Sequence, residues 1–356
     1  MQRDGGLERK IVEQVKRNQD AMLDGILKIV SIDSTRSEAQ ENMPFGSGVD
    51  KALTETLALA KAMGFVVENV DHYAGIVKYG TKPGWKTDPR YIGIFGHLDV
   101  VEAKGEWTNP PFSPAIRDGR IYARGILDNK GPILSCLYAL YAIKQLGIEL
   151  AHPIWIVFGT NEETGMADMD HYLNVKNPPI AGWTPDCKYP VVYAERGRAV
   201  FETEADVSHF TPEQFDLDLY DPEFGKLEFR LDEEHKLKVS YPASVTVEEI
   251  ARKVTAKIDA ALMDNMMPVF FPKDGTLCRV LQETYEQVTG LDGTPVTTTG
   301  GTYAKKVPNI VPFGPSFPGQ KGIAHLPDEW MDIDDLMANA KIYALSLYRL
   351  GIEEQL

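Results

Sequence analysis

The stretches YIGIFGHLDVV (residues 91–101) and PIWIVFGTNEETG (residues 153–165) decide the fold that this sequence predicts. Each opens with a short apolar run, which is typical of a buried strand, and each then continues into polar and charged residues. Strands that alternate with helices indicate a layered α/β domain. In open α/β sheets, ligands bind beyond the carboxyl ends of the strands. The polar residues at the ends of these two runs are therefore candidate site residues.

Helices and further strands are predicted around these two runs. A helical period over residues 7–32 predicts one broad apolar face, formed by Ile11, Val15, Met22, Ile26 and Val30. The other patterns predict helices over residues 49–64 and 131–147, and strands over residues 65–70 and 74–80. Gly64 stands where a C-terminal helix cap is expected. Residues 106–125 are rich in Pro and Gly and are expected to form a loop.

A change of composition predicts two domains in this 356-residue chain. Residues 198–272 are more acidic and less apolar than the rest, and they include a helix-like stretch over residues 246–262. We expect a small α+β domain there, inserted into a larger discontinuous domain made of residues 1–197 and 273–356.

Composition also excludes several classes of protein. The chain has 37 Lys and Arg against 52 Asp and Glu, a net charge of −15, which argues against nucleic acid or an anionic membrane surface as a partner. No apolar run approaches the roughly 18 residues of a membrane span, and the first ten residues show no secretory signal. Three cysteines without a CxxC pattern indicate neither disulfides nor a cysteine zinc site, so a cytoplasmic location is expected.

Three polar clusters carry the candidate chemistry. His97 and Asp99 follow one strand, Glu162 and Glu163 follow another, and Asp128 precedes a helix predicted to begin near Pro132. Each cluster also has an ordinary interpretation: a hydrogen-bonded surface pair, an acidic helix start, and a helix N-terminal residue with Lys130 as its exposed partner.

Two further residues favour a site over these ordinary interpretations. Asp186 and His325 lie downstream, both in loops flanked by Pro and aromatic residues. Imidazole and carboxylate ligands together suit Zn²⁺, with Co²⁺ or Mn²⁺ as substitutes. Five protein ligands are too many for one open tetrahedral site, but they suit two divalent ions that share a bridging carboxylate.

Five segments, in this order, carry a resemblance to a known family: GHLDVV, GILDNKGP, GTNEETG, TPD-x3-P-x2-YAERG and AHLPDEW. The set resembles the M20 family of metallopeptidases, and within it the PepV-type bacterial dipeptidases. The resemblance implies a zinc-exopeptidase-like layered catalytic domain with a central mixed sheet, and a small inserted α+β lid domain over residues 198–272.

The resemblance also implies a role for each candidate residue. His97 and Asp186 would bind one ion, Glu163 and His325 the other, and Asp128 would bridge the two. Glu162 resembles the general base that takes a proton from water and gives it to the leaving amine. Asp99 resembles the carboxylate that orients the His97 imidazole and fixes its tautomer.

The expected lid departs from the family pattern. Neither G-x-x-A-H-A nor G-x-N-A occurs between Gly197 and Leu262, and His209 is expected to be an ordinary surface residue. The family's Arg-Tyr-Pro feature appears as Ser240, Tyr241 and Pro242, without the arginine. The lid is therefore shortened, and the sequence identifies no substrate-binding residue.

Three functions follow as hypotheses. The first is a dipeptidase that hydrolyses small peptides with a water activated by two zinc ions. The second is a related deacylase or aminoacylase that acts on N-acyl amino acids. The third is a metal-binding relative of low activity with a structural or interaction role, which the shortened lid supports. The oligomeric state stays open.

Overall fold

The structure is a computed structural model, and it describes residues 3–80, 90–206, 210–217, 220–221, 225–226, 228–231, 236–320 and 322–354. His209 lies outside the described residues. The chain divides into two compact units. The larger unit comprises Met1–Val191, Asp274–Thr294 and Thr302–Leu356, and the smaller unit comprises Val192–Lys273 and Pro295–Gly301.

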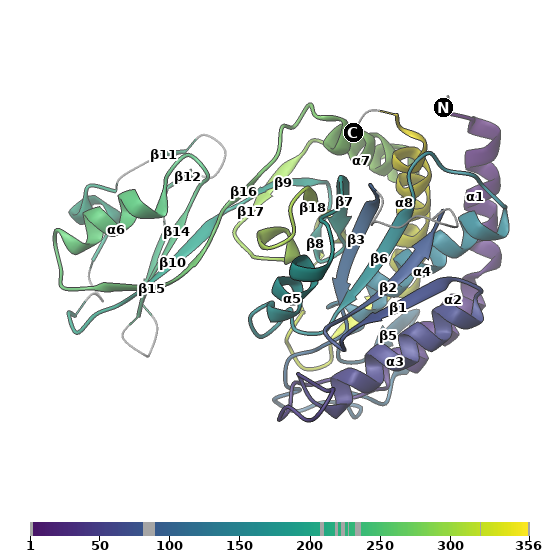
Figure 1. Ribbon diagram of the computed structural model, residues 1–356, viewed down its shortest axis with the longest axis horizontal. Helices are drawn as coiled ribbons and strands as arrows, with labels where there is room; N and C mark the ends of the chain where they lie inside the picture. Colours follow the sequence, from purple (N-terminus) through teal and green to yellow (C-terminus); the bar gives the residue numbers. More distant parts are fainter. Residues whose placement is uncertain are drawn as a thin grey trace. The chain divides into compact units, whose positions relative to one another are not determined.

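A six-stranded mixed sheet forms the centre of the larger unit (Figure 1), with the strand order β1-β2-β6-β3-β7-β18. Its strands are β1 (Val66–Val70), β2 (Ala74–Tyr79), β3 (Ile92–His97), β6 (Ile154–Gly159), β7 (Ala181–Thr184) and β18 (Ile310–Pro312). β1, β2 and β6 pair antiparallel, whereas β6, β3, β7 and β18 pair parallel. Every residue of β3 and β6 is buried, which explains why these strands appear as continuous apolar runs in the sequence.

Helices cover both faces of this sheet. They are α1 (Gly5–Arg17), α2 (Gln19–Val30), α3 (Ser47–Ala62), α4 (Lys130–Gln145), α5 (Ala167–Val175), α7 (Thr276–Thr289) and α8 (Ile333–Ile352). Ile133 of α4 lies against Gly96, whereas the ring of Tyr172 of α5 meets Phe95 edge to face, on the opposite side of β3. The layered α/β fold with a central mixed sheet is therefore confirmed.

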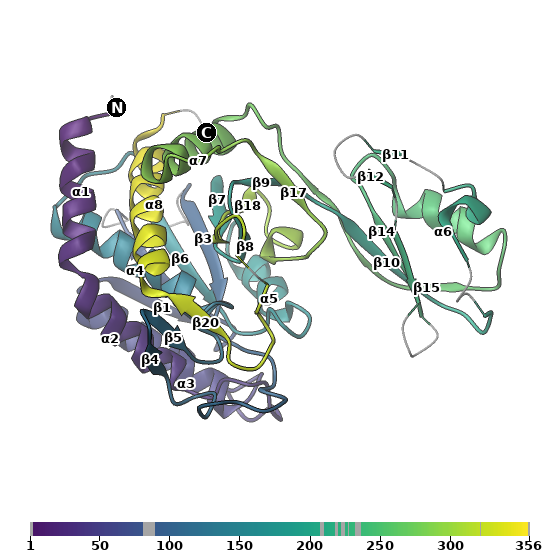
Figure 2. The ribbon, with the colours of Figure 1, turned by 180° about the vertical axis from the view of Figure 1, so that it is seen from behind.

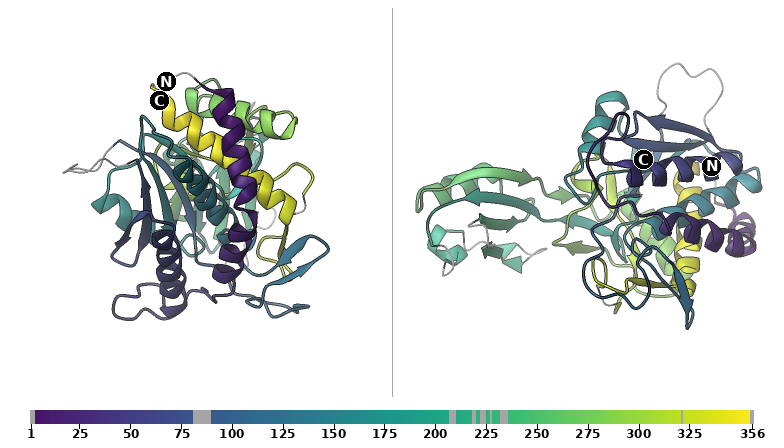
Figure 3. Two further views of the ribbon diagram at one scale, coloured as in Figure 1. Left: turned by 90° about the vertical axis from the view of Figure 1, so that its right-hand side faces the viewer. Right: turned by 90° about the horizontal axis from the view of Figure 1, so that it is seen from below.

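The helices α1, α4 and α8 lie side by side on one face (Figure 2 and the left view of Figure 3). The Tyr343 ring of α8 stacks on Trp183 of β7, with ring centroids 5.9 Å apart. A buried ion pair joins α8 to α1, since Arg349 Nε donates to Glu8 Oε1 at 2.8 Å and Nη2 to Oε2 at 2.9 Å. Burial acts to raise the pKa of Glu8, but hydrogen bonds from Arg349 and Gln287 and the charge of Arg349 together outweigh burial, and the pKa is lowered.

The helix expected over residues 7–32 is wrong in one respect, because the chain forms two helices there. α1 ends at Arg17 and α2 begins at Gln19. Between them, the buried Asn18 donates its side-chain N–H to Gln145 Oε1 of α4 at 2.8 Å. This tertiary contact holds the break, and no helical period could reveal it. Gly64 has φ +78°, as a glycine that follows a helix end requires.

The sequence had suggested a loop over all of residues 106–125, and this expectation is wrong in part. They contain a hairpin of β4 (Ala115–Arg117) and β5 (Arg120–Tyr122), and β5 also pairs with β20 (Trp330–Asp332). Asp118 and Gly119 have φ +50° and +75°, which is the backbone that a two-residue hairpin turn needs. The Asp-Gly dipeptide was thus the overlooked signal.

The smaller unit contains a four-stranded antiparallel sheet with the order β13-β14-β10-β15. The strands are β10 (Gly197–Glu202), β13 (Glu228–Leu231), β14 (Lys236–Tyr241) and β15 (Ala261–Met266). Helix α6 (Val247–Thr255) packs Ile250 and Val254 into the same apolar core as Phe201 and Val239. The helix expected over residues 246–262 is therefore too long, because its last residues pair with β10 as a strand.

Short elements complete both units. They are β8 (Cys187–Lys188), β9 (Val192–Glu195), η1 (Pro212–Phe215), β11 (Tyr220–Asp221), β12 (Gly225–Lys226), β16 (Val269–Phe270), β17 (Val296–Thr298), η2 (Tyr303–Lys305) and β19 (Pro315–Ser316). No helix within the described ranges combines the length and the apolar character that a membrane crossing demands.

The first prediction concerns the close contact between β3 and β7. A Cβ added to Gly182 would lie 1.7 Å from the backbone oxygen of Gly93, a backbone atom that cannot rotate away. We expect Gly182→Ala to lower the free energy of unfolding by about 2 kcal/mol or more, measured by urea denaturation. Gly5→Ala is the control, because no heavy atom lies within 4 Å of its added Cβ. Equal stability of the two variants would contradict the tight packing at Gly182.

Candidate metal centre

The seven candidate residues converge at one edge of the sheet in the larger unit. β6, β3 and β7 are neighbouring parallel strands, so their carboxyl ends meet at the same edge. His97 ends β3, Glu162 and Glu163 follow β6, and Asp186 follows β7. Asp99 lies two residues beyond β3, Asp128 directly precedes the turn into α4, and His325 comes from the segment between β19 and β20.

Asp128 lies between the two histidines. Its Oδ1 is 3.1 Å from His97 Nε2, and its Oδ2 is 3.0 Å from His325 Nε2. On the first side, Asp186 Oδ2 lies 3.5 Å from His97 Nε2, and on the second side, Glu163 Oε1 lies 3.1 Å from His325 Nε2. Asp128 therefore has one carboxylate oxygen near each histidine, with Asp186 beside the first histidine and Glu163 beside the second.

These distances suit divalent ions. Two donor atoms bound tetrahedrally at the usual zinc distances lie about 3.3 Å apart, close to the 3.0–3.5 Å found here. Two overlapping groups of ligand-type atoms, each within 4.8 Å of one another, share His97: His97 with Glu162 and Asp186, and His97 with Asp128 and Glu163. Because His97 directs only Nε2 at the cluster, it can bind one ion, and the contacts of His325 with Asp128 and Glu163 supply an imidazole for the second. The residues present therefore fit a pair of cations.

The charges of the cluster also favour bound cations. Burial, followed by the charge of Asp128, raises the pKa of Asp186 to about 7. Burial and the charge of Asp186 raise the pKa of Glu162 well above its usual range. These carboxylates therefore repel one another, and positive ions would relieve that repulsion.

The histidines respond to the same carboxylates. Hydrogen bonds to Asp128 and Glu163 raise the pKa of His325 to about 10. Burial acts to lower the pKa of His97, but Asp186 and Asp128 raise it well above its usual value. Burial acts to raise the pKa of Asp128, whereas hydrogen bonds from His325 and His97 lower it strongly.

Asp99 contacts both His97 and the acidic pair. His97 Nδ1 lies 2.9 Å from the backbone oxygen of Asp99 and 3.4 Å from its Oδ1. With a proton on Nδ1, the Nε2 atom keeps its lone pair directed at the cluster. The Asp99 carboxylate also accepts the backbone N–H groups of Glu162 and Glu163, both at 3.1 Å. One buried carboxylate thus fixes the backbone of the acidic pair beside the histidine.

Lys130 is not the exposed partner of Asp128 that the ordinary interpretation proposed. Its side chain is fully buried, and its Nζ donates to the backbone oxygen of Ile32 at 2.7 Å. Burial lowers the pKa of Lys130 to about 7. The Lys130 side chain therefore joins the first turn of α4 to the segment just after α2.

Three residues that sequence reasoning missed support the cluster. Asn129 donates to Asp186 Oδ1 at 3.2 Å and accepts the His97 backbone N–H at 3.3 Å. Glu329 accepts the backbone N–H of Asp128 at 3.1 Å and binds Arg124. Asn129 and Glu329 stand within the quoted segments GILDNKGP and AHLPDEW, which was the available signal.

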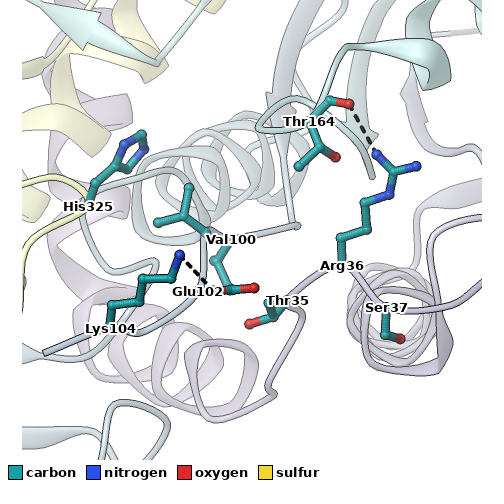
Figure 4. Close-up of a pocket in the computed structure, with 9 residues that line it drawn as sticks. Thr35, Arg36, Ser37, Val100, Glu102, Lys104, Thr164 and His325 are labelled. Atoms are coloured by element: carbon teal, nitrogen blue, oxygen red, sulfur yellow. Dashed lines mark hydrogen bonds and ion pairs between the residues drawn. The ribbon is translucent and has the colours of Figure 1, made fainter. Parts of the chain in front are cut away.

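A cleft of about 590 Å³ opens beside His325 (Figure 4). It is lined by Thr35, Arg36, Ser37, Val100, Val101, Glu102, Lys104, Thr164 and His325. Lys104 pairs with Glu102 at 3.0 Å, whereas the Arg36 guanidinium donates to the backbone oxygen of Thr164 at 3.2 Å. The cleft is therefore lined by both the His325 imidazole and Arg36, whose guanidinium group is directed at Thr164.

Comparison with known families decides the classification. The family described as peptidase family M20/M25/M40 matches residues 93–349, most of the chain. The chain belongs to this family. The resemblance inferred from the five sequence segments is thereby confirmed, and the chain is a member of a family of metallopeptidases.

Individual relatives and solved structures resemble this chain over most of its length. The Beta-Ala-Xaa dipeptidase of Lactobacillus delbrueckii subsp. lactis is 26% identical over 470 aligned positions, which cover 97% of this chain and 99% of the relative. Human carnosine dipeptidase 1 has a TM-score of 0.72 at 15% identity and covers 97% of this chain and 99% of its own. The YXEP protein of Bacillus subtilis, a dinuclear metal-binding M20 peptidase, has a TM-score of 0.56 at 13% identity over 94% of this chain and 99% of its own.

The second prediction separates the roles of the acidic pair. We expect the purified chain to bind about two divalent ions, and Glu163→Ala to lower that content because Glu163 lies beside His325. Glu162→Ala is expected to keep nearly normal metal content while hydrolysis is lost. Metal analysis after dialysis, with a peptide hydrolysis assay, measures both. Equal loss of metal in the two variants would show that these roles are wrongly divided.

Proposed function

We propose that the chain is a metal-dependent dipeptidase that hydrolyses the amide bond of small peptides with a water activated between two divalent ions. The observation that carries this proposal is the position of Asp128, with one carboxylate oxygen near each histidine. Membership of the M20 family and the dipeptidase names of its relatives support the same activity.

The metal ligands that we propose follow from the two groups of contacts. His97 and Asp186 would hold one ion, Glu163 and His325 the other, and Asp128 would hold both. Imidazole with carboxylate donors suits Zn²⁺, with Mn²⁺ or Co²⁺ as substitutes. When bound, such ions lower the pKa of a water and polarise a peptide carbonyl.

Glu162 is the residue that we propose for proton transfer. Its carboxylate lies in the cluster with His97 and Asp186, and its backbone is fixed by Asp99. A raised pKa favours acceptance of a proton near neutral pH. Glu162 would take a proton from the attacking water and deliver it to the leaving amine nitrogen, so that the carbon–nitrogen bond breaks and a free carboxylate forms.

The smaller unit is the part that we propose as the lid. Ser240, rather than an arginine, precedes Tyr241 there, so a substrate carboxylate needs another cationic group. Arg36 lines the cleft beside His325 and donates one hydrogen bond to a backbone carbonyl oxygen. We propose Arg36 as the group that binds the carboxylate end of the peptide, because guanidinium matches carboxylate geometry.

The third prediction concerns the reaction itself. We expect release of free amino acids from dipeptides with free amino ends, in the presence of Zn²⁺, Mn²⁺ or Co²⁺, and loss of this activity with a chelator. N-acetyl and N-succinyl amino acids are the comparison substrates in the same assay. Hydrolysis of the N-acyl compounds alone would instead indicate a deacylase. No hydrolysis of any substrate would favour the low-activity hypothesis.

The fourth prediction concerns Arg36. We expect Arg36→Gln to lower kcat/KM for a dipeptide about 10–100-fold, the effect of losing a hydrogen bond to a charged group. The same dipeptide with an amidated C-terminus should lose much less. Lys104→Gln is the matched control, since Lys104 lines the same cleft but pairs with Glu102. Equal losses for the acid and the amide would remove Arg36 from the carboxylate site.

A further inference from the structure

We infer that Arg124 and Glu329 form a buried clamp that positions the ligands of one ion, the ion between Asp128, Glu163 and His325. This inference rests on the proposed function, because it assumes that the cluster binds two ions. The clamp residues are not among the proposed ligands of either ion, so they are positioning residues. The evidence comes from four side-chain hydrogen bonds and one unusual backbone conformation.

Glu329 fixes the backbone that carries Asp128. Its Oε1 accepts the backbone N–H groups of Leu127 at 2.9 Å and Asp128 at 3.1 Å. Its Oε2 accepts Arg124 Nη1 at 2.7 Å. Both carboxylate oxygens of Glu329 therefore accept hydrogen bonds. Through these bonds Glu329 fixes the main chain that carries the shared carboxylate of Asp128.

Arg124 fixes the backbone that carries His325. Its Nη2 donates to the backbone oxygen of His325 at 3.2 Å, while its Nη1 binds Glu329. His325 has φ +68°, a left-handed conformation that is unfavourable for a residue other than glycine. The surrounding contacts must maintain this conformation, and the hydrogen bond from Arg124 reaches the same residue.

The clamp is rigid because it is buried and braced from several sides. Arg124 is 1% exposed and Glu329 is 0% exposed. The Arg124 guanidinium lies 5.0 Å from the centre of the Trp107 ring. The Ala123 backbone N–H donates to the Glu329 backbone oxygen at 3.0 Å. The strands β5 and β20, which adjoin these two residues in the chain, pair with each other. The two segments that carry Asp128 and His325 are therefore joined in one unit.

The clamp acts mainly on the His325 side of the cluster. Its contacts reach Asp128 and His325, whereas His97 is held by Asp99 and Asn129, and Asp186 by Asn129. The ion that depends on His325 loses two positioned ligands if the clamp is broken. The other ion shares Asp128 but keeps His97 and Asp186 in place, so it loses one positioned ligand rather than two, and its affinity should change less.

The test uses the full chain, stripped of metal with a chelator and titrated with Zn²⁺ against a chromophoric competitor. Glu329→Gln keeps the size of the side chain but turns an amide group toward Arg124. We expect one of the two Zn²⁺ affinities to fall about 10–100-fold, as is usual when a partner of a metal ligand is lost. The other affinity should stay within about threefold of the wild type. Arg124→Lys, which loses the two-pronged geometry, should give the same pattern.

A second buried ion pair provides a matched control. Arg349 and Glu8 make two hydrogen bonds at 2.8 and 2.9 Å in the contact between α1 and α8, and Arg349 is 3% exposed. Glu8→Gln should lower thermal stability while leaving both Zn²⁺ affinities unchanged. If Glu329→Gln only lowers stability in the same way, the clamp has no positioning role.

His325→Ala identifies the ion that is affected. If the clamp acts through His325, adding Glu329→Gln to His325→Ala should change the remaining affinity by little more than His325→Ala alone. Equal weakening of both ions by Glu329→Gln, with two ions bound by the wild type, would overturn the clamp alone. A wild-type chain that binds fewer than two ions would contradict the proposed function as well.

Discussion

The parallel pairing of β6, β3 and β7 is the constraint on which the site depends. These strands are buried along their length, so their hydrogen-bonding register is fixed by packing on both faces. The same register brings His97, the acidic pair and Asp186 to one edge. A slip of one residue in β3 would turn His97 to the other face. The chemistry of the cluster is thus a direct result of strand order.

Much of the fold and of the cluster could be predicted from the sequence because both depend on local patterns. Buried strands leave continuous apolar runs, and the polar residues directly after them mark the site. The break at Asn18 and the strand β15 were missed because contacts with distant segments override helical periodicity there. Arg124 and Glu329 were missed for a related reason: their partners lie about 200 residues away in the chain.

The cluster illustrates a balance between stability and chemistry. Four acidic side chains lie close together with limited exposure to water, and burial alone already raises the pKa of Asp186 and Glu162. Such a group destabilises a folded chain unless protons or cations compensate the charge. Backbone N–H groups compensate the charges of the neighbouring carboxylates Asp99 and Glu329 from within the fold. The remaining negative charge is what makes the cluster suited to divalent ions.

The position of α8 in the chain has a consequence for biosynthesis. α8 packs along α4 and contributes the ring that stacks on Trp183, yet it begins only at Ile333. During translation, the apolar surface of α4 therefore stays uncovered by α8 until nearly all of the remaining chain, including the whole smaller unit, has been synthesised. The nascent larger unit cannot complete its core from its N-terminal residues alone, so this interval is when we expect it to need protection by chaperones.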